Sequence, residues 1–192
     1  MANLRERLQQ AARDEIVTAA FELFAERGYP EVTVAEIAER AQVGRTTFFR
    51  YFGDKQEVVF ANEQFWLDDV SRRFREAAPV KAPTLGQLMA GVRTITASIC
   101  AQATRDPERY RLREQLLAAN PELADRAARK QRRLAETISE ALRDQGASAQ
   151  TAALVAQLAL ACYNAGRDTA GTDPAALAPA VDAAFARLKV TR

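Results

Sequence analysis

Apolar residues recur along this chain at the spacing of helices, and no stretch shows the strict alternation of a strand. A first helix is expected over residues 4–27, with Gly28 at its stop position. Its apolar positions share one face: Ile16, Ala19, Ala20, Leu23 and Phe24. The pattern therefore predicts a long amphipathic helix that buries one side.

Capping residues and turns place the next three helices. Thr33 begins a capping box, which predicts a short helix over residues 33–41. Another short helix is expected over residues 45–52, joined to the first by a turn of three or four residues, as in a helix-turn-helix. Asp54 then caps a longer helix, which is expected to run to about Glu76.

Pro79 and Pro83 mark the most visible break in the chain, and the segments beyond it are again helical. Five helices are expected there: 84–104, 106–119, 121–145, 148–167 and 174–188. Pro179 is expected to delay the start of the last helix or to kink it. The pattern predicts an all-α protein of about nine helices. Its expected parts are a three-helix helix-turn-helix domain at 1–53, a connecting helix at 54–78 and a larger helical domain at 79–192.

The helix at 45–52 carries a surface suited to duplex DNA. At 100° per residue, Phe48 and Phe52 face the core, and the residues that face outward are Arg45, Thr46, Phe49 and Arg50, with Thr47 and Tyr51 at the margins. An arginine near the start of such a helix can bind guanine O6 and N7 through its fork. The alternative from pattern alone is a small core with a solvated rim.

Composition narrows the classes of function. The formal net charge is only +2, but residues 40–55 hold four basic side chains against Asp54 alone. Histidine is absent and no glycine-rich phosphate loop occurs, so we expect no enzyme, no metal site and no cofactor. Two cysteines, a charged N-terminus without an apolar signal region and the lack of a long apolar run lead us to expect a cytoplasmic protein.

Residues 16–59, IVTAAFELFAERGYPEVTVAEIAERAQVGRTTFFRYFGDKQEVV, resemble the TetR family of transcriptional regulators. The resemblance rests on the segments AFELFAERGY, TVAEIA and TFFRYFGDK. It implies base contacts by Arg45, Thr46 and Thr47, and phosphate contacts by Thr33, Arg50, Tyr51 and Lys55. Two positions depart from the family pattern: Gly44 stands where a capping serine is usual, and Phe49 where a tyrosine commonly reaches a phosphate.

The resemblance also implies that the helices after about residue 80 bind a ligand and form a homodimer. The candidate pocket residues are Met89, Ile95, Thr96, Ile99, Cys100, Tyr110, Leu116, Leu117, Asn120, Tyr163 and Asn164. These are mostly apolar, so a largely apolar effector is expected, while clustered arginines such as Arg109, Arg111 and Arg113 leave open an anionic head group. The candidate dimer contacts are Leu154, Leu158, Ala161, Val181 and Phe185. An ordinary core within one chain fits the same two patterns.

These observations predict a cytoplasmic, homodimeric DNA-binding regulator, expected to be a ligand-responsive repressor that reads a palindromic operator in double-stranded DNA, with no membrane partner. The competing hypothesis is a helical ligand-binding or scaffold protein whose front helices contact a protein partner. Charge reversal at Arg45 and Lys55 distinguishes the two, because it abolishes a salt-sensitive DNA interaction and need not harm protein binding.

Overall fold

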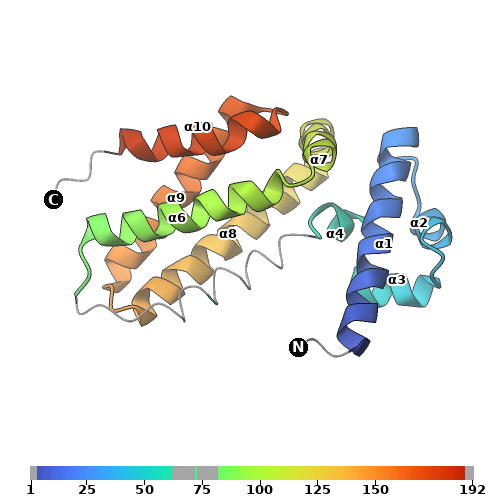
Figure 1. Ribbon diagram of the computed structural model, residues 1–192, viewed down its shortest axis with the longest axis horizontal. Helices are drawn as coiled ribbons and strands as arrows, with labels where there is room; N and C mark the ends of the chain where they lie inside the picture. The colour runs from blue at the N-terminus through green and yellow to red at the C-terminus, as the bar shows by residue number, and fades with distance from the viewer. Residues whose placement is uncertain (1–3, 62–71, 73–81, 189–192) are drawn as a thin grey trace. The chain divides into compact units, whose positions relative to one another are not determined.

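The computed structural model describes residues 4–61, 72 and 82–188. These residues form helices and no strand, which confirms the all-α prediction. The helices are α1 (Leu4–Arg27), α2 (Val34–Arg40), α3 (Arg45–Tyr51), α4 (Lys55–Val59), α6 (Leu85–Ala103), α7 (Pro107–Ala119), α8 (Pro121–Asp144), α9 (Ala149–Ala170) and α10 (Pro174–Arg187) (Figure 1). The part of the predicted connecting helix beyond Ala61, and the break at Pro79, lie outside the described residues apart from Arg72.

The chain divides into two compact units, Met1–Ala61 (unit 1) and Asn62–Arg192 (unit 2). In unit 1, α1 packs against α2 and α4, and α2 packs against α3. Ile16, Ile37 and Phe48 are buried in this unit with no exposed surface. Burying each such side chain contributes about 1.5–3 kcal/mol, so this small unit depends on a few large residues.

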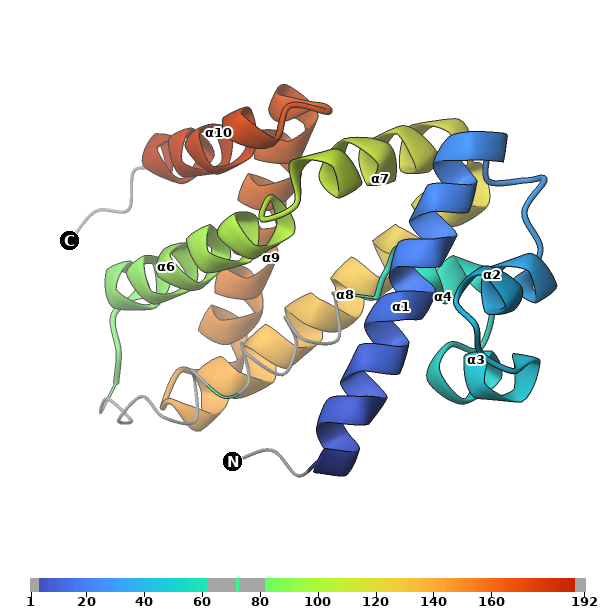
Figure 2. The ribbon, with the colours of Figure 1, turned by 45° about the vertical axis from the view of Figure 1, so that its right-hand side comes forward.

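Unit 2 is built around α9, which packs against α8, α10 and α6 (Figure 2). Its core gathers mainly aliphatic side chains and alanines of these helices, with Val155 and Leu177 fully buried. Gly166 lets α9 and α10 approach closely, because a Cβ built there would lie 2.6 Å from the Cα atom of Val181. Small residues at a helix crossing allow this short separation.

Local caps explain most of the helix bounds. Thr33 forms the predicted capping box, Thr84 forms another with Gln87 at the start of α6, and Gly28 takes a φ of 82° directly after α1. Asn120 lies between α7 and α8; its side-chain amide donates to the Leu116 carbonyl in the last turn of α7 at 2.8 Å and makes no capping hydrogen bond to α8. Pro179 neither delays nor ends α10, which begins at Pro174 and continues through it.

Candidate nucleic-acid interface

The turn between α2 and α3 sets the angle of a helix-turn-helix. Its backbone is held to α2 by the N–H of Ala41 on the Ile37 carbonyl and by the N–H of Val43 on the Ala38 carbonyl, both at 2.9 Å. Gln42 takes a φ of 53°, a left-handed conformation that reverses the chain within the turn. The two helices are thereby joined as the sequence predicted.

The inner face of α3 anchors it to the rest of unit 1. Phe48 is fully buried and Phe52 is 3% exposed, with ring centroids 5.8 Å apart. Arg13 of α1 places its guanidinium 5.2 Å from the Phe52 ring centroid and donates a hydrogen bond to the Ala61 carbonyl. These contacts fix the rotation of α3, and therefore which of its side chains face outward.

The outer face of α3 presents the predicted base-reading residues. Arg45, Thr46, Phe49 and Arg50 are exposed, and Thr47 and Tyr51 are half-buried beside them. Arg45 has no hydrogen bond or ion pair with any residue that the structure describes. The Arg50 guanidinium lies 5.1 Å from the Tyr51 ring centroid. The arrangement agrees with the sequence prediction, while the DNA contacts themselves stay predictions.

Two arginines elsewhere in unit 1 are paired with glutamates, whereas the segment around α3 contains no acidic residue. Arg27 is 2.6 Å from a Glu36 carboxylate oxygen, and Arg40 is 2.9 Å from one of Glu26. No acidic residue occurs from Gly44 to Gly53, around α3. The basic side chains of α3 are therefore not neutralised locally, which favours an anionic partner at this face.

Thr33 stands at the N-terminus of α2, where a phosphate contact is predicted. Its hydroxyl donates to Oε2 of Glu36 at 2.7 Å and accepts from the Glu36 N–H at 3.3 Å. The hydroxyl and backbone hydrogen bonds from Thr33, with the Arg27 guanidinium, lower the pKa of Glu36 to about 2. Thr33 is exposed, but its side chain is already engaged in the cap.

Lys55, another predicted phosphate contact, is held inside unit 1. Its Nζ atom donates to the carbonyls of Tyr29 and Val32 at 2.8 Å and of Pro30 at 3.2 Å. It also lies 4.4 Å from the Tyr29 ring centroid. An ammonium group has three N–H donors, and the ammonium group of Lys55 donates to three carbonyls of the α1–α2 turn. Lys55 thus positions the turn that leads into α2.

A second candidate site is a cavity of about 550 Å³ in unit 2, formed by α7, α8, α9 and the α9–α10 turn. Its walls are Glu114, Leu117, Ala118, Ala124, Ala127, Ala128, Gln131, Asn164, Arg167, Asp168, Gly171 and Thr172. Of the predicted pocket residues, Leu117 and Asn164 line it. The others do not: Met89, Ile95, Thr96, Ile99, Cys100, Tyr110, Leu116, Asn120 and Tyr163. Burial raises the pKa of Cys100 to about 11 and that of Tyr163 to about 12.

Sequence reasoning missed the charged residues of this cavity. Oε1 of Glu114 accepts a hydrogen bond from Nη1 of Arg113 at 2.8 Å, and its Oε2 lies 3.4 Å from Nε of Arg167. Glu114 is four residues after Tyr110 and three before Leu117, both buried, so it shares their helical face. A carboxylate at a core position of a helix was the signal that could have found this site.

The predicted dimer contacts separate into two groups. Leu154 is 49% exposed, and Leu158 and Ala161 lie on the same face of α9, half-buried and exposed respectively. Val181 and Phe185 are buried in the core of unit 2, so within one chain they already have their packing partners. The first three remain a predicted interface, and the other two serve the fold of the single chain.

Two further classes of feature are absent from the described residues. No group of three or more cysteine, aspartate or glutamate side chains in residues 4–61 and 82–188 is arranged to hold a metal ion. None of the helices in the same ranges is both long and apolar enough to cross a membrane.

Residues 16–61 match the model of the family described as bacterial regulatory proteins, tetR family. The transcriptional regulator TcmR of Streptomyces glaucescens is 46% identical over 56 residues, which is 29% of this chain and 25% of TcmR. The chain thus spans about a quarter of the length of this curated relative.

Solved structures resemble nearly the whole chain. The complex of SmeT with triclosan has a TM-score of 0.60 at 20% identity, over 92% of this chain and 90% of SmeT. Thermus thermophilus FadR, a TetR-family transcriptional repressor in complex with lauroyl-CoA, has a TM-score of 0.51 at 24% identity, over 94% and 96% of the two chains. Because both identities are below 25%, this likeness establishes the fold alone.

Proposed function

We propose that this chain, whose residues 16–61 belong to the tetR family of bacterial regulatory proteins, is a sequence-specific DNA-binding transcriptional regulator. The observation that carries the proposal is the outer face of α3, where Arg45 and Arg50 are exposed without a carboxylate beside them. A short helix with such a face fits the major groove of duplex DNA.

The residues of α3 take distinct roles in this proposal. Arg45 at the first turn binds the O6 and N7 atoms of guanine, and Thr46 and Thr47 reach base edges or a thymine methyl group. One well-aligned arginine fork contributes about 1–3 kcal/mol of base discrimination. Arg50 and Tyr51 contact backbone phosphates, which orient the helix and carry no sequence information.

The regulator acts as a homodimer on a palindromic operator. Leu154, Leu158 and Ala161 give α9 an apolar outward face with a small residue, which suits a helix-to-helix interface between two copies. Two recognition helices related by a two-fold axis read half-sites about 34–36 Å apart.

A small molecule in unit 2 controls DNA binding, and repression is the expected output. SmeT and Thermus thermophilus FadR hold triclosan and lauroyl-CoA in their structures, and the cavity of about 550 Å³ supports a ligand in this chain too. Control requires that the ligand bind the DNA-competent and the incompetent conformations unequally. The protein is not an enzyme, and it works where the DNA is, in the cytoplasm.

A second candidate function is a scaffold or ligand-binding protein that uses unit 1 to contact a protein. The observation that favours it is Phe49, a large apolar side chain that is 48% exposed on the outer face of α3. Charge reversal at Arg45 and Arg50 separates the two candidates. Lys55 is unsuitable for this purpose, because its ammonium group holds the α1–α2 turn.

The test is selection of sequences from a random pool of DNA duplexes by the purified protein. We expect an enriched inverted repeat, which the double variant Arg45→Ala/Thr46→Ala fails to enrich although it folds. Arg40→Ala is the matched control, since it removes an arginine that is already paired to Glu26. If the parent protein enriches no sequence at low salt, with or without a ligand of unit 2, the proposal is wrong.

A further inference from the structure

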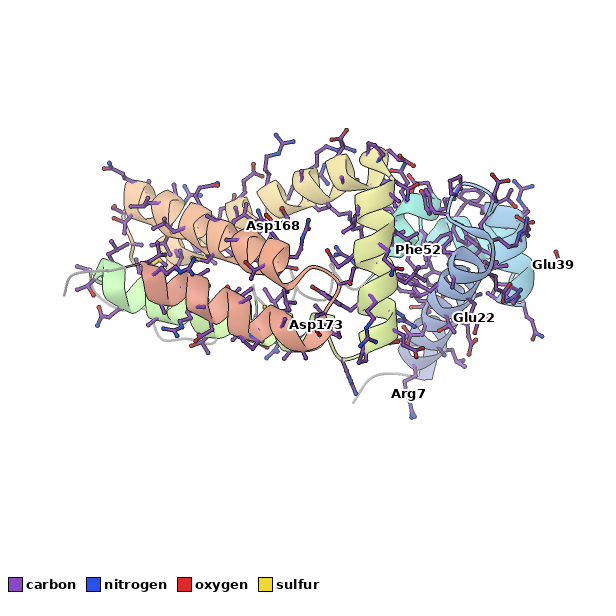
Figure 3. The ribbon with its side chains drawn as sticks, turned by 90° about the horizontal axis from the view of Figure 1, so that it is seen from above. Arg7, Glu22, Glu39, Phe52, Asp168 and Asp173 are labelled. Atoms are coloured by element: carbon purple, nitrogen blue, oxygen red, sulfur yellow. The ribbon has the colours of Figure 1, made fainter. Side chains whose placement is uncertain are left out.

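Phe49 is the only large apolar side chain of α3 that is exposed, and 48% of its surface is accessible to solvent. Its neighbour Phe48 is fully buried, and Phe52, three residues further on, lies inside unit 1 (Figure 3). A single exposed apolar residue is common on protein surfaces. What makes this one informative is its support from below and its position beside the residues proposed to read bases.

The ring of Phe49 rests on the buried ring of Phe48. Their centroids are 5.5 Å apart and their planes differ by 85°, which is an edge-to-face contact. Because Phe48 has no exposed surface, it is fixed by the core of unit 1 and gives Phe49 a rigid support. A side chain that is already ordered loses less freedom when it binds a partner.

Phe49 shares a helical face with the proposed base-reading residues. It lies four residues after Arg45 and three after Thr46, and all three are exposed. Residues at these spacings are neighbours on the surface of a helix. Four residues of helix rise about 6 Å, which is about two steps of 3.4 Å along a DNA strand. A helix that brings Arg45 and Thr46 to base edges in the major groove therefore brings the Phe49 ring there as well.

The chemistry of a phenyl ring restricts what it can recognise in the groove. The ring has no hydrogen-bond donor or acceptor, so it cannot bind a phosphate oxygen or the polar atoms of a base. The bases present one apolar group in the major groove, the C5 methyl group of thymine. The segment from Gly44 to Gly53 contains two arginines and no acidic residue, so its charge favours DNA over an acidic or neutral protein surface.

We propose that Phe49 is a specificity-determining residue of the DNA face, and that its ring packs against the C5 methyl group of a thymine. This thymine lies within about two base pairs of the guanine that Arg45 binds. The inference deepens the proposed regulatory function and rests on it. In the competing scaffold function the same ring contacts a protein, and DNA binding does not depend on it.

The experiment measures the affinity of the full chain for the inverted repeat that it enriches from random duplexes. Each thymine of one half-site is replaced in turn by deoxyuridine, which removes the methyl group and keeps the hydrogen bonds of the base pair. Loss of one buried methyl contact weakens binding about fourfold. We expect the parent to show this loss at one thymine near the guanine, and Phe49→Ala to bind the thymine and deoxyuridine duplexes equally.

Two further variants separate this contact from other roles. Phe49→Leu keeps an apolar side chain and should keep part of the methyl dependence. Thr46→Ala is the matched control on the same face, because it removes another side chain that can touch a thymine methyl group. It should leave the deoxyuridine effect at the Phe49 thymine unchanged. A purely structural role for Phe49 would weaken both duplexes alike and leave their ratio at the parent value.

Three results with an enriched operator would overturn the inference and keep the regulator. They are a half-site without a thymine within about two base pairs of a guanine, no loss of affinity at any deoxyuridine, and a loss that persists in Phe49→Ala. If Phe49→Ala binds the thymine operator as tightly as the parent, the ring serves another partner, such as a protein, and the inference is also wrong. A parent protein that enriches no sequence rejects the regulator and this inference together.

Discussion

Gly166 of α9 lies where this helix crosses α10, and substituting it tests the packing of unit 2. A methyl group on Gly166 would lie 2.6 Å from both the backbone nitrogen and the Cα atom of Val181. Because these are backbone atoms, no side-chain rotation relieves the overlap and the two helices have to move apart. Such overpacking costs typically about 1–3 kcal/mol, against a gain of about 1 kcal/mol in helix propensity. We expect Gly166→Ala to destabilise the protein by up to about 2 kcal/mol.

Gly91 of α6 provides the matched control for Gly166. It is exposed, and nothing lies within 4 Å of a methyl group built on it. Gly91→Ala therefore gains helix propensity without a steric cost and should stabilise the protein by about 0.5–1 kcal/mol. The same chemical change is thus expected to have opposite signs at the two positions.

The assay is urea denaturation followed by far-UV circular dichroism, at one protein concentration because the proposed dimer would make stability concentration-dependent. The midpoint should fall for Gly166→Ala and rise for Gly91→Ala, with unchanged slopes. If Gly166→Ala unfolds at the same urea concentration as Gly91→Ala or a higher one, the close crossing of α9 and α10 is refuted.

Three further predictions concern unit 1. Lys55→Met should lower the melting temperature and weaken operator binding without changing the dependence of log K on log salt, whereas loss of a phosphate contact would reduce that slope by about 0.9. Phe48→Ala should destabilise unit 1 by about 3–5 kcal/mol in urea denaturation, and the exposed Phe49→Ala by less than about 0.5 kcal/mol. Because the pKa of Glu36 is lowered from 4.5 to about 2, its contribution to stability is present above pH 4.5 and is lost as the pH falls through about 2. The difference in melting temperature between the parent and Glu36→Gln should therefore shrink across that range; a difference independent of pH would contradict the assignment.

Features encoded within a few residues could be predicted from the sequence. The capping box at Thr33 and the stop at Gly28 need only neighbours along the chain, and both occur as expected. The rotation of α3 was also predictable, since the helical repeat alone puts Phe48 inside and Arg45 outside. These are local properties of the backbone and of helical geometry.

Features that depend on which helix meets which could not be predicted in this way. The apolar spacing of Val181 and Phe185 shows that they are buried, but it does not show whether a second copy or the same chain covers them. The contact of Gly166 with Val181 joins two helices, and a single glycine within an alanine-rich helix does not reveal it. A periodic pattern identifies a buried face and leaves its partner undefined.

The arginines show why net charge was a poor guide to function here. The formal net charge of +2 says little about partners, because what matters is which cations lack a carboxylate. Arg27 and Arg40 are paired with glutamates and stabilise the surface of unit 1. Arg45 has no such partner among the described residues and faces solvent on α3, where long, polyanionic DNA can reach it. Arg167 lies 3.4 Å from a carboxylate oxygen of Glu114 and belongs to the paired group as well. One side-chain type therefore serves both the fold and the proposed DNA face, and the presence or absence of a neighbouring carboxylate distinguishes the two.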